Sequence, residues 1–176
     1  MSDFLTDVET LRKQARDEIE KGPITAAYRA DVGRVIEVLN AALATELVCV
    51  LRYRQHHFAA KGLDAEPVAA EFLVHATEEQ DHGDRLAARI AQLGGTPDMD
   101  PDTLTARAHS EYETSDNLVE MIRENLVAER VAIASYTEII GWLGTNDPTT
   151  RRLIEDILTV EEEHADDLLG FLEKVH

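Results

Sequence analysis

Apolar residues recur at intervals of three and four along most of this chain, the pattern of helices that bury one face and expose the other. Four long segments follow it, separated by short breaks rich in Gly, Pro, Asn and Asp. The predicted helices cover about residues 31–60, 64–93, 115–143 and 147–175. Ser115 or Asp116 is expected to cap the third helix and Asp147 the fourth, with Pro148 as its first residue. The pattern therefore predicts an all-α four-helix bundle.

Two further segments complete the chain. Residues 3–21 predict a short amphipathic helix, with Leu5, Val8 and Leu11 on its apolar face. Residues 96–114 break the helical pattern, apart from a short helical piece around 104–108, and suit a long crossover that makes the second and third helices parallel. We therefore expect an N-terminal helical extension over residues 1–30 and the bundle over residues 31–176.

The two halves of the predicted bundle repeat each other. The first helix contains Leu43-x-x-Glu46-x-Val48-x-Val50-x-x-Tyr53, which matches Leu126-x-x-Glu129-x-Val131-x-Ile133-x-x-Tyr136 in the third helix. The second helix contains Thr77-x-Glu79-x-x-His82, which matches Thr159-x-Glu161-x-x-His164 in the fourth. A duplicated helix hairpin, related by a pseudo-twofold axis, accounts for both matches.

Each predicted helix carries one of these glutamates near its middle on the apolar face, where an ionised carboxylate is disfavoured unless paired or bound to a metal. The two Glu-x-x-His pairs place an imidazole on the same face. The same faces carry no Lys or Arg, which a bundle held by internal salt bridges would need. Two divalent ions would neutralise the carboxylates, and ligands without thiolates suit iron or manganese and permit zinc. The predicted metal ligands are Glu46, Glu79, His82, Glu129, Glu161 and His164.

Composition and charge restrict the binding partners and the cellular compartment that this protein is expected to have. A length of 176 residues suits one domain, and a formal net charge of −18 argues against nucleic acid, because phosphate contacts need clustered Lys and Arg. The single Cys excludes an intrachain disulfide and fits a reducing compartment. The N-terminus has no apolar signal core, and no stretch approaches the length of a membrane span. We therefore expect a cytoplasmic protein with neither a nucleic-acid nor a membrane partner.

One glutamate on each of two helices and Glu-x-x-His on the other two is the ligand arrangement of ferritin-like di-iron proteins. Residues 31–175 resemble bacterioferritins within the ferritin-like superfamily. The resemblance implies a ferritin-like bundle and a ferroxidase that oxidises Fe(II) to Fe(III) with O2 or H2O2 at an intrasubunit di-iron centre. Such a protein would store or detoxify iron inside a hollow shell.

The resemblance also assigns roles to single residues. It implies that Glu79 and Glu161 bridge the two irons. Glu46 with His82 would then complete one metal, and Glu129 with His164 the other. Tyr53 falls where bacterioferritins keep a tyrosine beside the metals, which makes it the candidate catalytic, redox-active residue. Bacterioferritins ligate haem through a Met directly after the first bridging Glu. The corresponding residue here is Gln80, so no haem is predicted.

The assembly expected from the resemblance is a homo-oligomer. The chain ends twelve residues after His164, without the short fifth helix that helps to close the 24-subunit shell of bacterioferritins. Dps-like proteins form 12-subunit shells without that helix, although their sites are shared between subunits. A Dps-like 12-mer with a bacterioferritin-type site inside each subunit is therefore favoured over a 24-mer.

Two other functions stay open. A rubrerythrin- or manganese-catalase-like enzyme would scavenge peroxide at the same di-metal site without storing metal, although the chain lacks the Cys-x-x-Cys rubredoxin module that delivers electrons. A structural bundle would hold a redox-silent metal such as zinc that only supports folding.

The remaining polar residues near the apolar faces have simpler interpretations. His75, one turn before the first Glu-x-x-His pair, fits a hydrogen-bonded core histidine better than an outer-sphere or transient iron site. Tyr136 is equally consistent with packing and with a role beside the metals. Cys49 is expected to be a small buried hydrophobe, and Asp84 and Asp166 to be surface acids.

Overall fold

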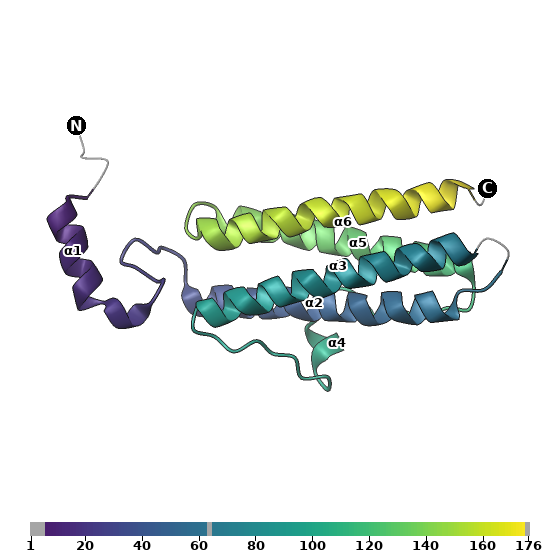
Figure 1. Cartoon of the computed structure of the whole chain (residues 1–176), viewed down its shortest axis with the longest axis horizontal. Coiled ribbons are helices and arrows are strands. Elements are labelled where there is room, and N and C mark those ends of the chain that lie inside the picture. The colour runs from purple at the N-terminus through teal and green to yellow at the C-terminus, as the bar shows by residue number, and fades with distance from the viewer. Residues whose placement is uncertain (1–5, 63–64, 175–176) are drawn as a thin grey trace.

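The computed structural model describes residues 6–62 and 65–174, and every regular element in this part is a helix, as predicted (Figure 1). Four long helices form a bundle, and each begins and ends close to its predicted position. They are α2 (Val32–Ala59), α3 (Ala65–Gln92), α5 (Leu118–Leu143) and α6 (Pro148–Lys174). The all-α four-helix architecture predicted from the periodicity is thereby confirmed.

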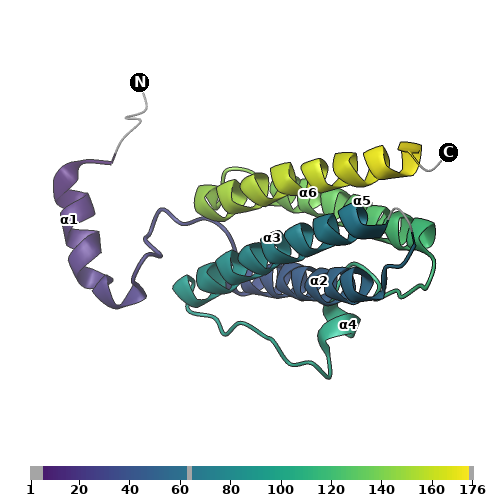
Figure 2. The ribbon, with the colours of Figure 1, turned by 45° about the vertical axis from the view of Figure 1, so that its right-hand side comes forward.

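The bundle consists of two antiparallel hairpins, α2–α3 and α5–α6, joined by a long crossover. The connection leaves the end of α3, runs back along the outside of the bundle and enters α5 at the opposite end, so that α3 and α5 are parallel (Figures 1 and 2). It contains one short helix, α4 (Leu104–Arg107). The predicted crossover is therefore present.

The crossover packs against the outer side of α2 and forms hydrogen bonds with it. Leu104 is buried against Ala44 and Val48. The Asn40 carboxamide oxygen accepts from the Asp98 backbone N–H at 2.8 Å, and the Thr45 hydroxyl accepts from the His109 N–H at 2.9 Å. The α2 helix is thus covered on two sides, by the bundle core and by the crossover.

The N-terminal segment lies beyond the end of the bundle (Figures 1 and 2). It contains α1 (Val8–Asp17) and a 3-10 turn (Ile19–Lys21), so the helix predicted over 3–21 is interrupted at Glu18. Leu5, expected on its apolar face, falls outside the described residues. Val8, Leu11 and Ile19 are exposed, so the described residues leave the rest of that face uncovered.

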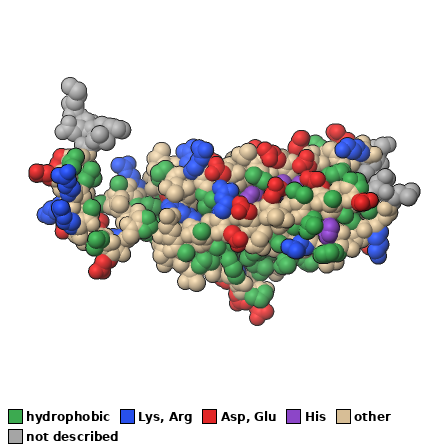
Figure 3. All heavy atoms as spheres, viewed as in Figure 1, with side chains coloured by type: hydrophobic (Ala, Val, Ile, Leu, Met, Phe, Trp, Pro, Cys, Tyr) green, Lys and Arg blue, Asp and Glu red, His purple; other side chains and the backbone are tan. Residues whose placement is uncertain are grey.

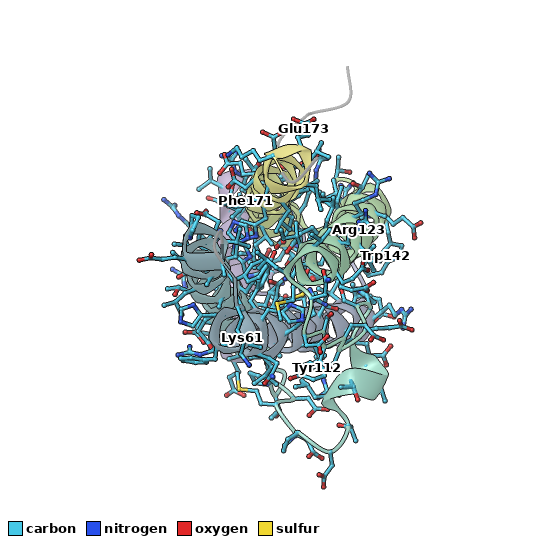
Figure 4. The ribbon with its side chains drawn as sticks, turned by 90° about the vertical axis from the view of Figure 1, so that its right-hand side faces the viewer. Lys61, Tyr112, Arg123, Trp142, Phe171 and Glu173 are labelled. Carbon is cyan, nitrogen blue, oxygen red and sulfur yellow. The ribbon has the colours of Figure 1, made fainter. Side chains whose placement is uncertain are left out.

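Two apolar clusters fill the bundle on either side of its middle. The first includes Leu39, Leu43, Leu86, Ile90, Ile139, Leu143, Ile154 and Ile157. The second includes Cys49, Val68, Phe72, Met121, Ile122 and Leu168. Figure 4 looks along the bundle and shows the side chains of all four helices filling the space between them. Burying each large side chain contributes about 1.5–3 kcal/mol, so these clusters hold the helices together around a polar centre.

The start of α5 differs from the prediction. Asn117 is its N-cap, and the Asn117 side-chain oxygen accepts from the backbone N–H groups of Val119 at 2.9 Å and Glu120 at 3.1 Å. The Ser115 hydroxyl accepts instead from the Asn117 N–H at 3.1 Å. The expectation that Ser115 or Asp116 caps this helix was therefore wrong, because Ser115 stabilises the turn that precedes the cap.

The start of α6 agrees with the prediction and also anchors a buried ion pair. The Asp147 carboxylate accepts from the Thr150 N–H at 2.9 Å, as an N-cap should. The Arg89 guanidinium from α3 reaches both Asp147 oxygens, at 3.0 and 3.1 Å, and the Tyr28 hydroxyl donates to the same carboxylate at 2.8 Å. Asp147 is 1% exposed and Arg89 9%, so one carboxylate joins three segments of the chain away from water.

We predict that Asp147→Ala lowers the free energy of unfolding of the metal-free protein by about 3–5 kcal/mol, because it leaves the Arg89 charge buried without a partner. Asp31→Ala is the matched control, since Asp31 caps α2 from an exposed position and should cost about 1 kcal/mol. Urea unfolding followed by circular dichroism measures both. Equal losses in the two variants would contradict the role of the ion pair.

Candidate metal centre

The structure brings all six predicted ligands together in the middle of the bundle. Each lies at a point on its helix where the apolar periodicity turns the side chain inward, and each is at most 2% exposed. The six are Glu46 on α2, Glu79 and His82 on α3, Glu129 on α5, and Glu161 and His164 on α6. They form two overlapping groups of four.

The first group surrounds the His82 imidazole. Its Nδ1 atom lies 3.3 Å from Glu46 Oε2, 3.5 Å from Glu79 Oε2 and 3.0 Å from Glu161 Oε1. A metal with bonds of about 2.1 Å can join two ligand atoms that are up to about 4.2 Å apart. These separations therefore fit one divalent cation.

The second group surrounds the His164 imidazole. Its Nδ1 atom lies 3.4 Å from Glu79 Oε1, 3.8 Å from Glu161 Oε2 and 4.0 Å from Glu129 Oε2. This group fits a second cation by the same criterion. Glu79 and Glu161 belong to both groups, with a different oxygen of each facing each imidazole, which is the geometry that two bridging carboxylates require.

No Lys or Arg of the described residues pairs with any of the four glutamates; their only charged partners there are the two histidines. Several buried ligand atoms have no hydrogen-bond partner: Glu46 Oε2, Glu79 Oε1, Glu129 Oε2, both oxygens of Glu161, and Nδ1 of His82 and His164. Each such atom costs about 1–3 kcal/mol if it stays unsatisfied. The donor set therefore fits two divalent cations and does not fit a bundle held by internal salt bridges.

The carboxylates strongly perturb one another in the absence of cations. Burial raises the pKa of Glu46 well above its usual range, and the charges of Glu161 and Glu79 raise it further. Burial likewise raises the pKa of Glu129, with the charges of Glu79 and Glu161 adding to the effect. Two of the four carboxyl groups thus resist ionisation unless positive charge is supplied.

The histidines supply part of that charge. Burial by itself lowers the pKa of His82, but the neighbouring carboxylates of Glu161, Glu46 and Glu79 outweigh it and raise the pKa to about 12. Burial also lowers the pKa of His164, and its carboxylate partners raise it to about 11. Without metal, the imidazoles are therefore protonated at neutral pH, and a metal ion must displace those protons.

Two tyrosines donate hydrogen bonds from one hairpin to the other. Their acceptors are Glu46 and Glu129, the two outer glutamates, each of which belongs to one ligand group only. The Tyr53 hydroxyl on α2 donates to Glu129 on α5, and the Tyr136 hydroxyl on α5 donates to Glu46 on α2. The two bonds are related by the pseudo-twofold axis that the repeat predicts. Tyr136 therefore has a polar role in the centre as well as a packing role.

One residue close to the centre escaped the sequence analysis. The Glu78 carboxylate accepts a hydrogen bond from His164 Nε2 at 2.9 Å, and so fixes the orientation of that imidazole. Glu78 directly precedes Glu79 and is turned off the inward face of α3, so the periodicity gives no signal for it. Its role depends on α6 lying beside α3.

The secondary predictions also agree with the structure. His75 is buried, and its Nδ1 atom lies 3.2 Å from the Tyr53 hydroxyl, as expected of a hydrogen-bonded core histidine. Cys49 is buried, whereas Asp84 and Asp166 are exposed. In the part of the chain that the structure describes, no helix is long and apolar enough to cross a membrane.

A four-helix bundle with a long crossover and a central pair of carboxylate–histidine groups defines the ferritin-like class of proteins. The sequence-family model of the ferritin-like domain matches residues 36–176, and the chain belongs to the ferritin family.

Relatives place the chain near two branches of the family. The DNA protection during starvation protein of Halobacterium salinarum is 30% identical over 173 residues, which is 92% of each chain. A dodecameric thioferritin of Bacteroides fragilis, described as bacterioferritin-related, superposes with a TM-score of 0.80 at 34% identity and covers 84% of this chain and 89% of its own. The Desulfovibrio desulfuricans bacterioferritin, described for its diiron site in different catalytic states, superposes with a TM-score of 0.73 at 26% identity, covering 82% and 81%.

We predict that metal binding releases protons from the centre, because metal ions and protons compete for the same ligand atoms. His82 and His164 each lose a proton, and Glu46 and Glu129 add to the release, giving about two to four protons per chain at neutral pH. Affinity should therefore fall as the pH is lowered. Calorimetric titration with zinc in buffers of different ionisation enthalpy measures the release, and a heat that is independent of the buffer would contradict it.

Proposed function

We propose that this protein is a ferroxidase, which binds two Fe(II) ions at the central site and oxidises them to Fe(III) with O2 or H2O2 for iron storage or detoxification. The observation that carries this proposal is the pair of overlapping ligand groups that share Glu79 and Glu161. Two shared carboxylates hold two metal ions close enough for both to react with one oxidant molecule.

The ligand chemistry and the relatives both support iron as the metal. Carboxylate and imidazole ligands suit Fe(II) and Mn(II) and permit zinc. The similar bacterioferritin of Desulfovibrio desulfuricans is described as having a diiron site. Gln80 stands at the position where the haem-ligating Met of bacterioferritins is expected. Its side chain is exposed and donates a hydrogen bond to Asp84. Haem therefore forms no part of the proposal.

The protein contributes position and charge to the reaction. Glu79 and Glu161 each offer one oxygen to each metal position, and the tyrosine hydroxyls hold Glu46 and Glu129 as the outer ligands. Four carboxylates stabilise the higher charge of the Fe(III) product. Each Fe(II) gives up one electron, so that a pair of ions reduces O2 to H2O2 with two protons, or H2O2 to two waters with two protons.

We further propose that copies of this chain assemble into a hollow shell of 12 subunits. The similar Bacteroides fragilis protein is described as dodecameric. The exposed apolar residues of the N-terminal segment, Val8, Leu11 and Ile19, offer contacts for a neighbouring copy. Although the Halobacterium salinarum relative is named for DNA protection, the net charge of −18 supports an assembly that leaves nucleic acid unbound.

An aerobic Fe(II) titration of the metal-free protein tests this function, with oxidation followed optically and mass by light scattering. Rapid oxidation of about two irons per chain, followed by continued soluble loading of a large assembly, is the expected result. Saturation near two irons in a small oligomer would replace storage by peroxide scavenging of the rubrerythrin or manganese-catalase kind. Oxidation no faster than in buffer would leave a structural metal.

We predict that Glu79→Ala combined with Glu161→Ala abolishes rapid Fe(II) oxidation, because it removes the two carboxylates common to both metal positions. The helical content should be retained, since the substitutions also remove two mutually repelling charges. The matched control is Asp81→Ala with Glu162→Ala, which removes two exposed acids from the same helices. Unchanged oxidation kinetics in the first variant would refute the site assignment.

We predict that Tyr53→Phe slows Fe(II) oxidation while leaving two metal ions bound per chain, because Tyr53 acts as a redox group beside the metals. Tyr136→Phe is the matched control, since it loses the equivalent hydrogen bond to Glu46. Stopped-flow oxidation rates and metal content are measured for both variants. Equal slowing in the two would reduce Tyr53 to a hydrogen-bond donor that orients Glu129.

A further inference from the structure

A third group of ligand-type side chains lies outside the central site, between α3 and α6. It consists of Glu71 and His75 on α3 and Asp167 on α6. His75 Nε2 lies 3.5 Å from Glu71 Oε1 and 3.7 Å from Asp167 Oδ2. The side chains of His75, Glu71 and Asp167 are 1%, 33% and 55% exposed, so the group leads from the buried core to the surface.

The hydrogen bonds of Tyr53 settle which nitrogen of His75 carries the proton. The single hydroxyl proton of Tyr53 is donated to Glu129, so the Tyr53 oxygen can only accept from His75 Nδ1. In the neutral imidazole, Nε2 therefore carries a lone pair, and that atom is buried without a hydrogen-bond partner. A lone pair that faces two carboxylates is repelled by both unless a positive charge lies between them.

We propose that His75, Glu71 and Asp167 form a third divalent-cation site, which takes one ion per chain from solvent independently of any oxidation. The two separations from Nε2 are within the roughly 4.2 Å that a metal with bonds of about 2.1 Å can join. One imidazole and two carboxylates suit Fe(II), Mn(II) or Zn(II), and water completes the coordination on the exposed side. The face of α3 and α6 carries many acidic side chains, which attract cations towards it (Figure 3).

The repeat within the chain shows that this group is specific to one half. The second Glu-x-x-His pair follows the first by 82 positions, since Glu161 corresponds to Glu79. At the same offset, the counterparts of Glu71 and His75 are Leu153 and Ile157, and the counterpart of Asp167 is Arg85. Three ligand-type residues therefore stand together on one side only, where the other half of the same fold has apolar and basic residues.

The third site is in direct contact with the central one. The His75 ring stacks on the His164 ring, with centroids 4.0 Å apart and an angle of 22° between the planes. Through its other nitrogen, His75 reaches the Tyr53 hydroxyl. A cation on Nε2 is thus separated from the central ligands by a single imidazole, in a position to exchange with solvent through the exposed Asp167.

Zinc binding measured by equilibrium dialysis and elemental analysis tests the proposal without any redox reaction. The unmodified protein should bind three zinc ions per chain, one for each ligand group. Asp167→Asn should bind two, whereas Asp166→Asn, which removes the adjacent exposed acid, should bind three. Two zinc ions in the unmodified protein, or equal stoichiometry in the two variants, would overturn the proposal and leave His75 as a hydrogen-bonded core histidine.

A second measurement separates this site from the proposed ferroxidase. In the Glu79→Ala and Glu161→Ala background, one zinc ion per chain should remain and should be lost on adding Asp167→Asn. Anomalous diffraction from zinc-loaded crystals of the unmodified protein should place this ion at His75 Nε2. If no zinc remains once Glu79 and Glu161 are replaced, the third site is overturned, whatever the protein does with iron.

Discussion

Four carboxylates buried at one level of a helical bundle repel one another in a medium of low dielectric constant, and the rest of the structure is arranged around that constraint. The imidazoles of His82 and His164 stand between the carboxylates, and two tyrosine hydroxyls hold the outer pair. Apolar clusters on both sides exclude water and supply the packing energy that offsets the repulsion. No Lys or Arg of the described residues pairs with these carboxylates, so without metal only bound protons offset their charge. Metal ions can take the place of those protons, and the centre therefore fits two cations.

The crossover makes this arrangement possible. By returning the chain to the opposite end of the bundle, it makes α3 and α5 parallel and relates the two hairpins by a pseudo-twofold axis (Figure 1). The shared carboxylates then face each other from α3 and α6, and each tyrosine reaches the glutamate of the opposite hairpin. Neither hairpin carries a complete set of ligands for either metal position, so the centre forms only when the two halves dock.

Periodicity and the internal repeat predict the helices, the crossover and the six clustered residues, because these depend on which face of a helix points inward. They do not predict Glu78 or the position of Asp167 beside His75, since these contacts depend on α6 lying next to α3 and on how far each helix is rotated. The cap of α5 was misassigned for a related reason: Ser115 and Asn117 both have suitable side chains, and only the turn geometry decides between them.

The hydrogen bond between Glu78 and His164 makes the two halves of the centre chemically unequal. Val160 stands at the position equivalent to Glu78, so His82 has no carboxylate in the matching place. A carboxylate behind an imidazole increases its basicity as a ligand. The imidazoles of the two ligand groups therefore have different hydrogen-bond partners, and His164 alone has the Glu78 carboxylate behind it. The internal repeat thus gives the bundle its symmetry, whereas a single carboxylate outside the repeat makes the surroundings of the two imidazoles different.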